Sequence, residues 1–316
     1  MGTETSEIAV VGAGAIGLYL ASQIQTYHGQ TVLISRNAQT ATKVNDEGIF
    51  CQIEHTVQQT EVPSTVQTKG LGAQSLIVLA VKTYGVQEAL HRIKDLVGPD
   101  TVILTLQNGL GTVEMVQEFF PETIIMAGSM VVGAERTGIN TVKIYGRPEV
   151  TIGLLAQKDQ QTLEWLGHLF RDIGFTAHIT MHTYEVLWRK LVINTAINPV
   201  ALLSGKTNGA LLNSVDAQRL IRSLAQETIR VAQALGFLQG EDGYVEKITQ
   251  VLQETAGNKA SMLQDFLAGQ PTEIDAISGQ VVLLGQRLKI PTPYNETMLY
   301  LIRLLENKTH GMPQIH

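Results

Sequence analysis

The chain has 316 residues, of which 44% are hydrophobic and 16% charged, with a formal net charge of −6 and a mean hydropathy of +0.08. This length suits two domains of roughly 100 to 200 residues each, and the composition excludes an intrinsically disordered chain. The modest acidic charge argues against a protein that binds nucleic acid or anionic membranes.

The cysteine and histidine content limits the cellular setting and the kinds of site. A single cysteine, Cys51, excludes an intrachain disulfide and favours a cytoplasmic location. We interpret Cys51 as a small half-buried residue of a strand. The eight histidines stand singly, without the spacing of metal ligands, so we predict no metal site.

The apolar N-terminal stretch IAVVGAGAIGLYLA is not interpreted as a signal sequence. Glu4 and Glu7 precede it where a signal sequence carries basic residues, and glycines interrupt it. No run reaches the ~18 apolar residues of a membrane span, so we predict a soluble protein without a membrane partner.

In the first half of the chain, short apolar strands alternate with helices. We predict strands at residues 7–12, 31–35, 75–81, 101–106 and 123–130, with extended pieces at 48–54 and 55–62. We predict helices at residues 15–29, 38–46, 86–97 and 112–119. Such an alternation is typical of a doubly wound parallel sheet with helices on both faces, a Rossmann-type α/β fold. Further strands are expected at residues 141–146, 149–155 and 175–180, with a helix at 161–172.

From about His182 onward, helical spacing replaces the strands. We predict helices at residues 187–197, 217–236, 246–254, 273–288 and 296–306. Pro271 and Pro293 are expected just inside helix starts, Gly236 at a helix end, and a polar tail from about Lys308. The sequence therefore predicts a Rossmann-type domain at residues 1–181 and an all-α domain at residues 182–316.

A glycine-rich turn follows the first predicted strand and opens the first predicted helix. Gly12, Gly14 and Gly17 form the pattern G-x-G-x-x-G in the stretch VGAGAIG. In this position the glycines allow a tight turn, close approach of a pyrophosphate and close helix–strand packing. The alternative is a tight turn in an ordinary βα unit. The residues that we predict to bind a dinucleotide here are Gly12, Ala13, Gly14, Ala15, Ile16 and Gly17.

The end of the second predicted strand bears on the choice of dinucleotide. It carries Arg36 and Asn37, where an NAD-binding domain usually has an acid. A guanidinium suits a 2′-phosphate, so we predict NADP(H), with a solvated surface arginine as the alternative. Lys82 and Asn108 also follow predicted parallel strands, at the sheet edge where such folds bind ligands.

The stretch LWRKLVINTAINPVALL, residues 187–203, carries polar side chains in an otherwise apolar helix. Lys190, Asn194 and Asn198 recur every four residues and share one helix face, and Pro199 is expected to end or kink the helix. Burial lowers the pKa of a lysine and makes it a better proton donor near neutral pH. The alternative is that the Lys190 side chain extends to solvent, while Asn194 and Asn198 are core residues with their hydrogen bonds satisfied.

These residues belong to a set of motifs that resembles the ketopantoate reductase (2-dehydropantoate 2-reductase) family. The resemblance extends from the glycine loop to about residue 305. It comprises VGAGAIG, VKTYGV, LQNGLGT, WRKLVINTAINP, TNG, SMLQD, PTEIDAISG and IPTP. It implies reduction of 2-dehydropantoate to (R)-pantoate with NADPH, the substrate lying in a cleft against the helical domain.

The resemblance also implies roles for individual residues. Lys190 matches the general acid, and Glu273 matches an acid that takes part in catalysis and binds the substrate hydroxyl. Positions that match substrate contacts are Asn194, Asn198, Ser261, Asn258 and Asn108. Positions that match cofactor contacts are Gly12, Gly14, Arg36, Lys82 and Asn108. One departure is Ala260, which stands where many relatives have a second serine before MLQD.

Other functions stay open at this point. A dehydrogenase of the same fold would act on C3-branched or aromatic D-2-hydroxyacids, as mandelate-type enzymes do, with NAD(H). A non-catalytic NADP-binding regulator would leave the co-occurrence of Lys190, Glu273 and Ser261 unexplained. A helical interaction module on a Rossmann scaffold would have a large exposed apolar surface on the second domain. The apolar C-terminal helices suit either packing within the monomer or a homodimer interface.

Overall fold

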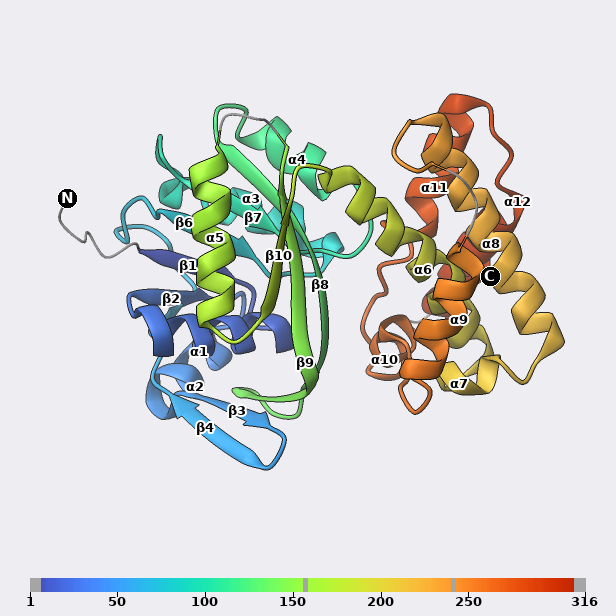
Figure 1. Cartoon of the computed structure of the whole chain (residues 1–316). Helices are drawn as coiled ribbons and strands as arrows, with labels where there is room; N and C mark the ends of the chain where they lie inside the picture. The colour runs from blue at the N-terminus through green and yellow to red at the C-terminus, as the bar shows by residue number, and fades with distance from the viewer. Residues whose placement is uncertain (1–6, 156–158, 240–242, 310–316) are drawn as a thin grey trace, which may run out of the picture. The chain divides into compact units, whose positions relative to one another are not determined.

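The structure is a computed structural model that describes residues 7–155, 159–239 and 243–309. The chain divides into two compact units, each described by itself below (Figure 1). Unit 1 comprises Met1–Gln107 and Thr112–Thr183, and unit 2 comprises Asn108–Gly111 and Tyr184–His316. The four residues Asn108–Gly111 thus group with residues that are distant in sequence.

Unit 1 is built on a sheet whose central strands are all parallel. Their order is β5-β2-β1-β6-β7-β8, the strand order of the dinucleotide-binding doubly wound fold. These strands are β1 (Ile8–Val11), β2 (Thr31–Ile34), β5 (Ser64–Thr65), β6 (Leu76–Leu79), β7 (Val102–Thr105) and β8 (Ile124–Arg136). The predicted Rossmann-type fold is confirmed. The two-residue strand β5 was not predicted, because it is too short to show a periodic pattern.

Four more strands extend the sheet beyond β8. They are β3 (Ile49–Ile53), β4 (Thr56–Thr60), β9 (Thr141–Leu154) and β10 (Thr176–Thr180). The prediction of separate strands at 141–146 and 149–155 is wrong, because β9 runs through both as the antiparallel partner of β8. The glycine and proline between them lie where the register shifts opposite Val131 and Gly133, and Gly146 takes a φ of +69°. The break in the pattern therefore marks a bulge and not a turn.

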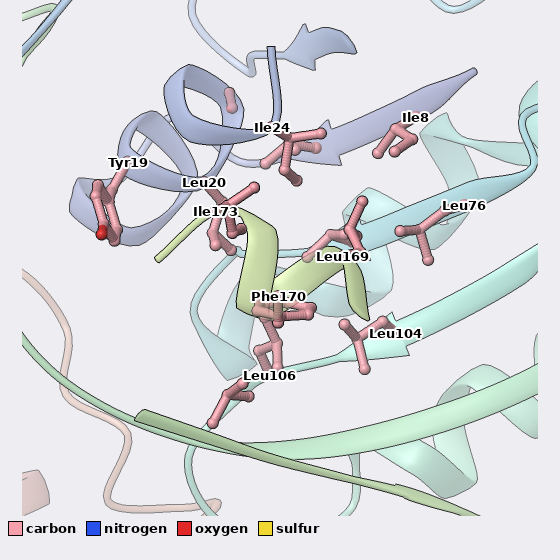
Figure 2. Packing of buried hydrophobic residues seen from close by; sticks show 14 of the residues in the cluster. Ile8, Tyr19, Leu20, Ile24, Leu76, Leu104, Leu106, Leu169, Phe170 and Ile173 are labelled. Atoms are coloured by element: carbon pink, nitrogen blue, oxygen red, sulfur yellow. The ribbon is translucent and has the colours of Figure 1, made fainter. Parts of the chain in front are cut away.

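Helices α1 and α5 pack on the same face of the central strands. The helices of unit 1 are α1 (Ala15–His28), α2 (Ala38–Glu47), α3 (Val86–Arg92), α4 (Thr112–Phe119) and α5 (Gln160–Asp172). Figure 2 shows Leu20 and Ile24 of α1 and Phe170 of α5 packed with Leu76 and Leu104 from the strands. Each fully buried side chain of this size contributes roughly 2 kcal/mol of transfer free energy. The carboxyl ends of the parallel strands are thereby held in a fixed arrangement.

Cys51 belongs to this core. It is fully buried in β3, deeper than the half-buried position that we predicted. Burial raises the pKa of its thiol to about 11, so the reactive thiolate is disfavoured at neutral pH.

Unit 2 is helical, as predicted. Its helices are α6 (Thr183–Ser204), α7 (Asn208–Leu211), α8 (Val215–Ala234), α9 (Tyr244–Glu254), α10 (Ser261–Leu267), α11 (Ser278–Leu288) and α12 (Pro293–Thr309). The short helices α7 and α10 were not predicted. Helix α11 begins at Ser278, not at residue 273, because residues 273–277 form turns. Pro271 therefore precedes a turn and does not start a helix, whereas Pro293 does start α12.

Two further expectations concern helix ends. Gly236, with a φ of +78°, follows the end of α8 as expected. We predicted a polar tail from about Lys308, but α12 continues to Thr309. Residues 310–316 lie outside the described part of the chain.

Helix α6 is the apolar centre of unit 2. Trp188, Leu191, Val192 and Ala196 are all buried in its hydrophobic cluster. We expected Pro199 to end or kink this helix. The helix does not end there but continues to Ser204. Within the described residues, only α6 is long and apolar enough to cross a membrane. Two thirds of its apolar stretch (67%) is buried inside the protein, as in the core helix of a soluble protein.

The start of α12 is held by a buried carboxylate from α8. Glu227 is 1% exposed and accepts hydrogen bonds from the backbone N–H groups of Tyr294 and Asn295, each at 2.9 Å. The Asn295 side chain donates a third bond, also at 2.9 Å. These N–H groups lie in the first turn of the helix, where a negative charge also complements the helix dipole.

Candidate active site

The glycine loop of unit 1 packs closely against the sheet at two of its three glycines. A Cβ atom at Gly17 would lie 1.7 Å from the carbonyl oxygen of Gly12, and Gly12 itself has a φ of +113°. Both positions therefore exclude other residues for reasons of packing and backbone conformation. At Gly14, in contrast, a Cβ atom would meet nothing within 4 Å. The loop is thus tight against the sheet and open at its middle glycine.

The loop leads directly into the N-terminus of α1. Gly14 is the N-cap, no side chain caps the helix, and its first turn holds no acid. The first N–H groups of a helix have no partner within the helix and carry a partial positive charge. An anion such as a phosphate satisfies both requirements, so these residues fit a dinucleotide.

Charged side chains meet just past the end of β2. Arg36 is exposed, and its Nη1 lies 4.0 Å from Oε2 of Glu88 in α3. Arg92, one turn further along α3, donates to Oε1 of Glu88 at 2.8 Å. Asn37 accepts hydrogen bonds from the backbone N–H groups of Gln39 and Thr40 as the cap of α2. Arg36 is therefore the residue at this strand end whose side chain suits an anion.

Two polar residues of unit 1 follow the ends of β6 and β7. Lys82 follows β6, is half-buried and begins a short 3₁₀ turn, Thr83–Gly85. Gln107 follows β7 and donates from its Nε2 to the carbonyl oxygens of Leu79 and Val81, at 2.7 and 3.0 Å. Gln107 thus ties together the carboxyl ends of the two strands, a role that we did not predict.

Asn108, the next residue, belongs to unit 2. Its Nδ2 donates to Oε2 of Glu273 at 3.0 Å, and Glu273 is only 5% exposed. The loop that carries Asn108 packs directly on the turn that carries Glu273. A Cβ atom at Gly109 would lie 2.2 Å from the carbonyl oxygen of Ala276, and Leu110 donates to that same oxygen at 3.0 Å. This close approach therefore requires a glycine at position 109, the first glycine of QNGLG.

Lys190 lies on α6 and is half-buried. Burial lowers the pKa of its ammonium group to about 8, and the negative charge of Glu273 counteracts part of this effect. A lysine with this pKa is charged at neutral pH and gives up its proton far more readily than an exposed lysine. Lys190, Glu273 and Asn108 thus form one connected group of polar residues.

Asn194 and Asn198 follow Lys190 on the same face of α6 at successive helical turns. Asn194 is half-buried, and its Nδ2 is a buried donor that finds no acceptor among the described residues. Asn198 is 6% exposed. Thr195, on another face, instead bonds to Thr228 of α8 at 2.9 Å. A buried amide without a partner costs about 1–3 kcal/mol, which favours a role other than stability for Asn194.

Asn258 and Ser261 lie together around the start of α10. Both are exposed, and within the described residues neither side chain makes a hydrogen bond. The loop before Ser261 is fixed by Asn208, whose N–H donates to Asn258 O at 2.9 Å and whose Nδ2 donates to Thr255 Oγ1 at 2.8 Å. Asn208 is part of the TNG motif that we noted in the sequence. Its contacts with Thr255 and Asn258 were not predicted.

The structure therefore groups the predicted residues by unit. Unit 1 holds the glycine loop, Arg36 and Lys82. Unit 2 holds Asn108 hydrogen-bonded to Glu273, whose charge acts on Lys190, and Asn194 and Asn198 follow Lys190 on α6. Asp275 is not part of this group: it forms an ion pair with Arg303 at 2.5 Å.

Sequence comparisons place both units in one family. Profiles described as "Ketopantoate reductase PanE/ApbA" and "Ketopantoate reductase PanE/ApbA C terminal" match residues 8–157 and 183–306. A 2-dehydropantoate 2-reductase of Halobacterium salinarum is 28% identical over 303 residues, which cover 95% of this chain and 98% of the relative. One of Vibrio cholerae is 29% identical over 306 residues, covering 95% and 97%.

Solved structures show the same fold. The crystal structure of 2-dehydropantoate 2-reductase from Geobacter metallireducens matches with a TM-score of 0.87 at 26% identity, covering 94% of this chain and 99% of the other. A D-mandelate dehydrogenase with NADH and anilino(oxo)acetate matches with a TM-score of 0.92 at 22% identity, covering 97% and 100%, and shares the fold. With profile matches that span most of both units, this chain belongs to the ketopantoate reductase family.

Proposed function

We propose that this protein reduces 2-dehydropantoate to (R)-pantoate with NADPH in the cytoplasm. The observation that carries the proposal is Lys190, a half-buried lysine with a pKa lowered to about 8 beside the carboxylate of Glu273. Reduction of a ketone requires a proton donor for the oxygen, and such a lysine is suited to this role. The names of the curated relatives support the choice of substrate.

A bound nicotinamide supplies the hydride that adds to the keto carbon. The ammonium of Lys190 donates a proton to the keto oxygen, which becomes the hydroxyl of the product, and the lysine is left neutral. Glu273 favours the charged form of Lys190 before the reaction, and it accepts a hydrogen bond from the hydroxyl of the substrate. Asn108 fixes the orientation of the Glu273 carboxylate through the bond to Oε2.

The remaining polar residues of unit 2 orient the oxo acid. Asn194 and Asn198 contact the substrate or orient Lys190, and the unpaired Nδ2 of Asn194 gains an acceptor when substrate is bound. Ser261 donates to the substrate carboxylate, with Asn258 as a further polar contact; both side chains are exposed. An oxo acid held by several donors is bound in one orientation, which favours attack on one face of the ketone.

Unit 1 supplies the residues that bind the dinucleotide. The loop from Gly12 to Gly17 and the N-terminus of α1 hold the pyrophosphate, Arg36 binds the 2′-phosphate, and Lys82 lies at the same edge of the sheet. Two observations support these assignments: there is open space at Gly14, and the N-terminus of α1 has no side-chain cap, so both suit a phosphate group.

A second function is favoured by one observation. Glu88 places an acid beside Arg36, and acids in this region of the fold usually accept the ribose hydroxyls of NAD. An NAD-dependent D-2-hydroxyacid dehydrogenase acting on C3-branched or aromatic oxo acids is therefore the alternative.

A panel of rates separates the two functions. Initial rates are measured with 2-dehydropantoate and with benzoylformate, each with NADPH and NADH. The proposal predicts the highest kcat/KM for 2-dehydropantoate with NADPH. A preference for benzoylformate with NADH would establish the alternative, and cofactor binding without turnover of either acid would indicate a non-catalytic binding protein.

A further inference from the structure

Two guanidinium groups and one carboxylate meet at the carboxyl end of β2. Glu88 of α3 directs its two oxygens toward different partners: Oε1 accepts from Arg92 at 2.8 Å, and Oε2 lies 4.0 Å from Nη1 of Arg36. The carboxylate therefore lies between the two arginines. The sequence did not indicate this group, because β2 and α3 are more than 50 residues apart.

The two arginines differ in how firmly they are held. The Arg92 side chain is 26% exposed, and its Nη1 donates to the carbonyl oxygens of Ser35 and Val66, at 3.4 and 3.3 Å. Its backbone carbonyl oxygen accepts a bond from Thr68 at 2.7 Å. The Arg36 side chain is 73% exposed, and its only ion pair among the described residues is the long contact to Glu88. Arg92 thus fixes Glu88, whereas Arg36 is able to change its partner.

We propose that Glu88 is a specificity-determining residue that limits the preference of this site for NADP(H) over NAD(H). This inference rests on the proposed function, in which Arg36 binds the 2′-phosphate. On binding, Arg36 exchanges the carboxylate of Glu88 for the phosphate, while Arg92 keeps Glu88 in place. A 2′-phosphate therefore gains Arg36 as a partner but lies near the negative charge of Glu88, which stays paired with Arg92.

The same carboxylate affects the two cofactors in opposite ways. A 2′-phosphate carries nearly two negative charges, so Glu88 repels it, whereas a ribose 2′-hydroxyl has a proton to donate to a carboxylate. The pair of Arg36 and Glu88 is exposed and screened by solvent, which keeps the expected effect moderate. Removal of the charge is expected to tighten binding of a 2′-phosphate by about three- to ten-fold.

The test measures binding of adenosine fragments to the full-length protein by calorimetry. The probes are 2′,5′-ADP, which carries the 2′-phosphate, and 5′-AMP, which lacks it. The variant is Glu88→Gln, and the matched control is Glu118→Gln, which removes an exposed glutamate from α4 of the same unit. Thermal unfolding of each variant checks that it is folded.

Glu88→Gln is expected to lower the Kd for 2′,5′-ADP by about three- to ten-fold and to leave the Kd for 5′-AMP unchanged or higher. The gain should shrink at high salt, and it should be smaller in an Arg36→Ala background, where Glu88 still repels the phosphate but no longer competes with it for Arg36. An unchanged Kd for 2′,5′-ADP, an equal shift for both probes, or the same shift in Glu118→Gln would overturn the inference.

The design separates this inference from the cofactor assignment. If the wild-type protein binds 2′,5′-ADP and Glu88→Gln has no effect, the role of Glu88 alone is wrong. If the wild-type protein binds neither probe, the assignment of the dinucleotide site is wrong and the inference is overturned with it.

Discussion

Asn108 donates a hydrogen bond of 3.0 Å to Glu273, a residue 165 positions further along the chain. The bond joins the loop after β7 to the turn before α11. Asn108 thereby orients the carboxylate whose charge favours the protonated form of Lys190. The relationship connects three conspicuous motifs, QNGLG, WRKL and TEID, in one polar group.

The pKa of Lys190 predicts opposite pH profiles for the two directions of the reaction. Reduction requires the charged lysine, so its kcat/KM should be constant below pH 8 and fall about tenfold per pH unit above it, because the pKa is lowered from 10.5 to about 8. Oxidation of the hydroxy acid requires the neutral lysine and should rise through the same pH. The profiles are measured with the cofactor saturating. A limb near pH 10.5, the ordinary value for lysine, would contradict the assignment.

Glu273→Gln tests the electrostatic coupling between the two residues. The glutamine keeps an oxygen that can accept from Asn108 but removes the charge that raises the pKa of Lys190. The alkaline limb of the reduction profile should therefore move to lower pH, by about one unit or more. Asn108→Ala, which retains the charge of Glu273, is the control and should move the limb less. A limb that stays in place in Glu273→Gln would show that the two groups are not coupled.

The substitution Asn194→Leu tests whether Asn194 on α6 serves function or stability. The Nδ2 of Asn194 is buried without an acceptor, so an apolar side chain of similar shape should leave the free energy of unfolding unchanged or raise it by about 1 kcal/mol. The kcat/KM for the oxo acid should nevertheless fall at least about tenfold, the worth of a single hydrogen bond to substrate. Chemical denaturation and steady-state kinetics are measured on the same preparation. A large loss of stability with unchanged kinetics would assign Asn194 to the core.

Glu227 is predicted to matter for stability and not for chemistry. Three donors at the start of α12 bond to its buried carboxylate. Glu227→Ala should therefore lower the free energy of unfolding by about 3 kcal/mol or more. The exposed residue Glu254 provides the comparison, since Glu254→Gln should change stability by about 0.5 kcal/mol or less. Equal effects of the two substitutions in urea denaturation would refute the role of Glu227.

Much of the fold follows from local patterns in the sequence. The apolar strands after residues 7, 31, 75 and 101 have no polar alternation, which is the signature of a parallel sheet covered on both faces. The glycine loop was recognisable because each glycine stands at a position with a distinct steric demand, as at Gly12 and Gly17. The spacing of Lys190, Asn194 and Asn198 on one helix face could likewise be predicted from the helical repeat.

Features that depend on contacts distant in sequence could not be predicted. Gly146 and Pro148 look like a turn, yet they lie in a bulge, and pairing with β8 resumes at Glu149. Glu273 lies in a turn that is fixed by packing against Gly109 and Leu110, so the helical pattern from residue 273 misled the prediction of the start of α11. The contact of Glu88 with Arg36 requires α3 to pack beside the end of β2, which no local pattern specifies.

The central claim, that Lys190 is the general acid, is tested most directly by Lys190→Ala. The turnover number for 2-dehydropantoate and the Kd for NADPH are measured side by side for the variant and the wild-type protein. The account predicts a fall in kcat of about 10²-fold or more, the range expected for loss of a general acid, with little change in the Kd for NADPH. A variant that keeps near-normal turnover and the wild-type pH profile would contradict it.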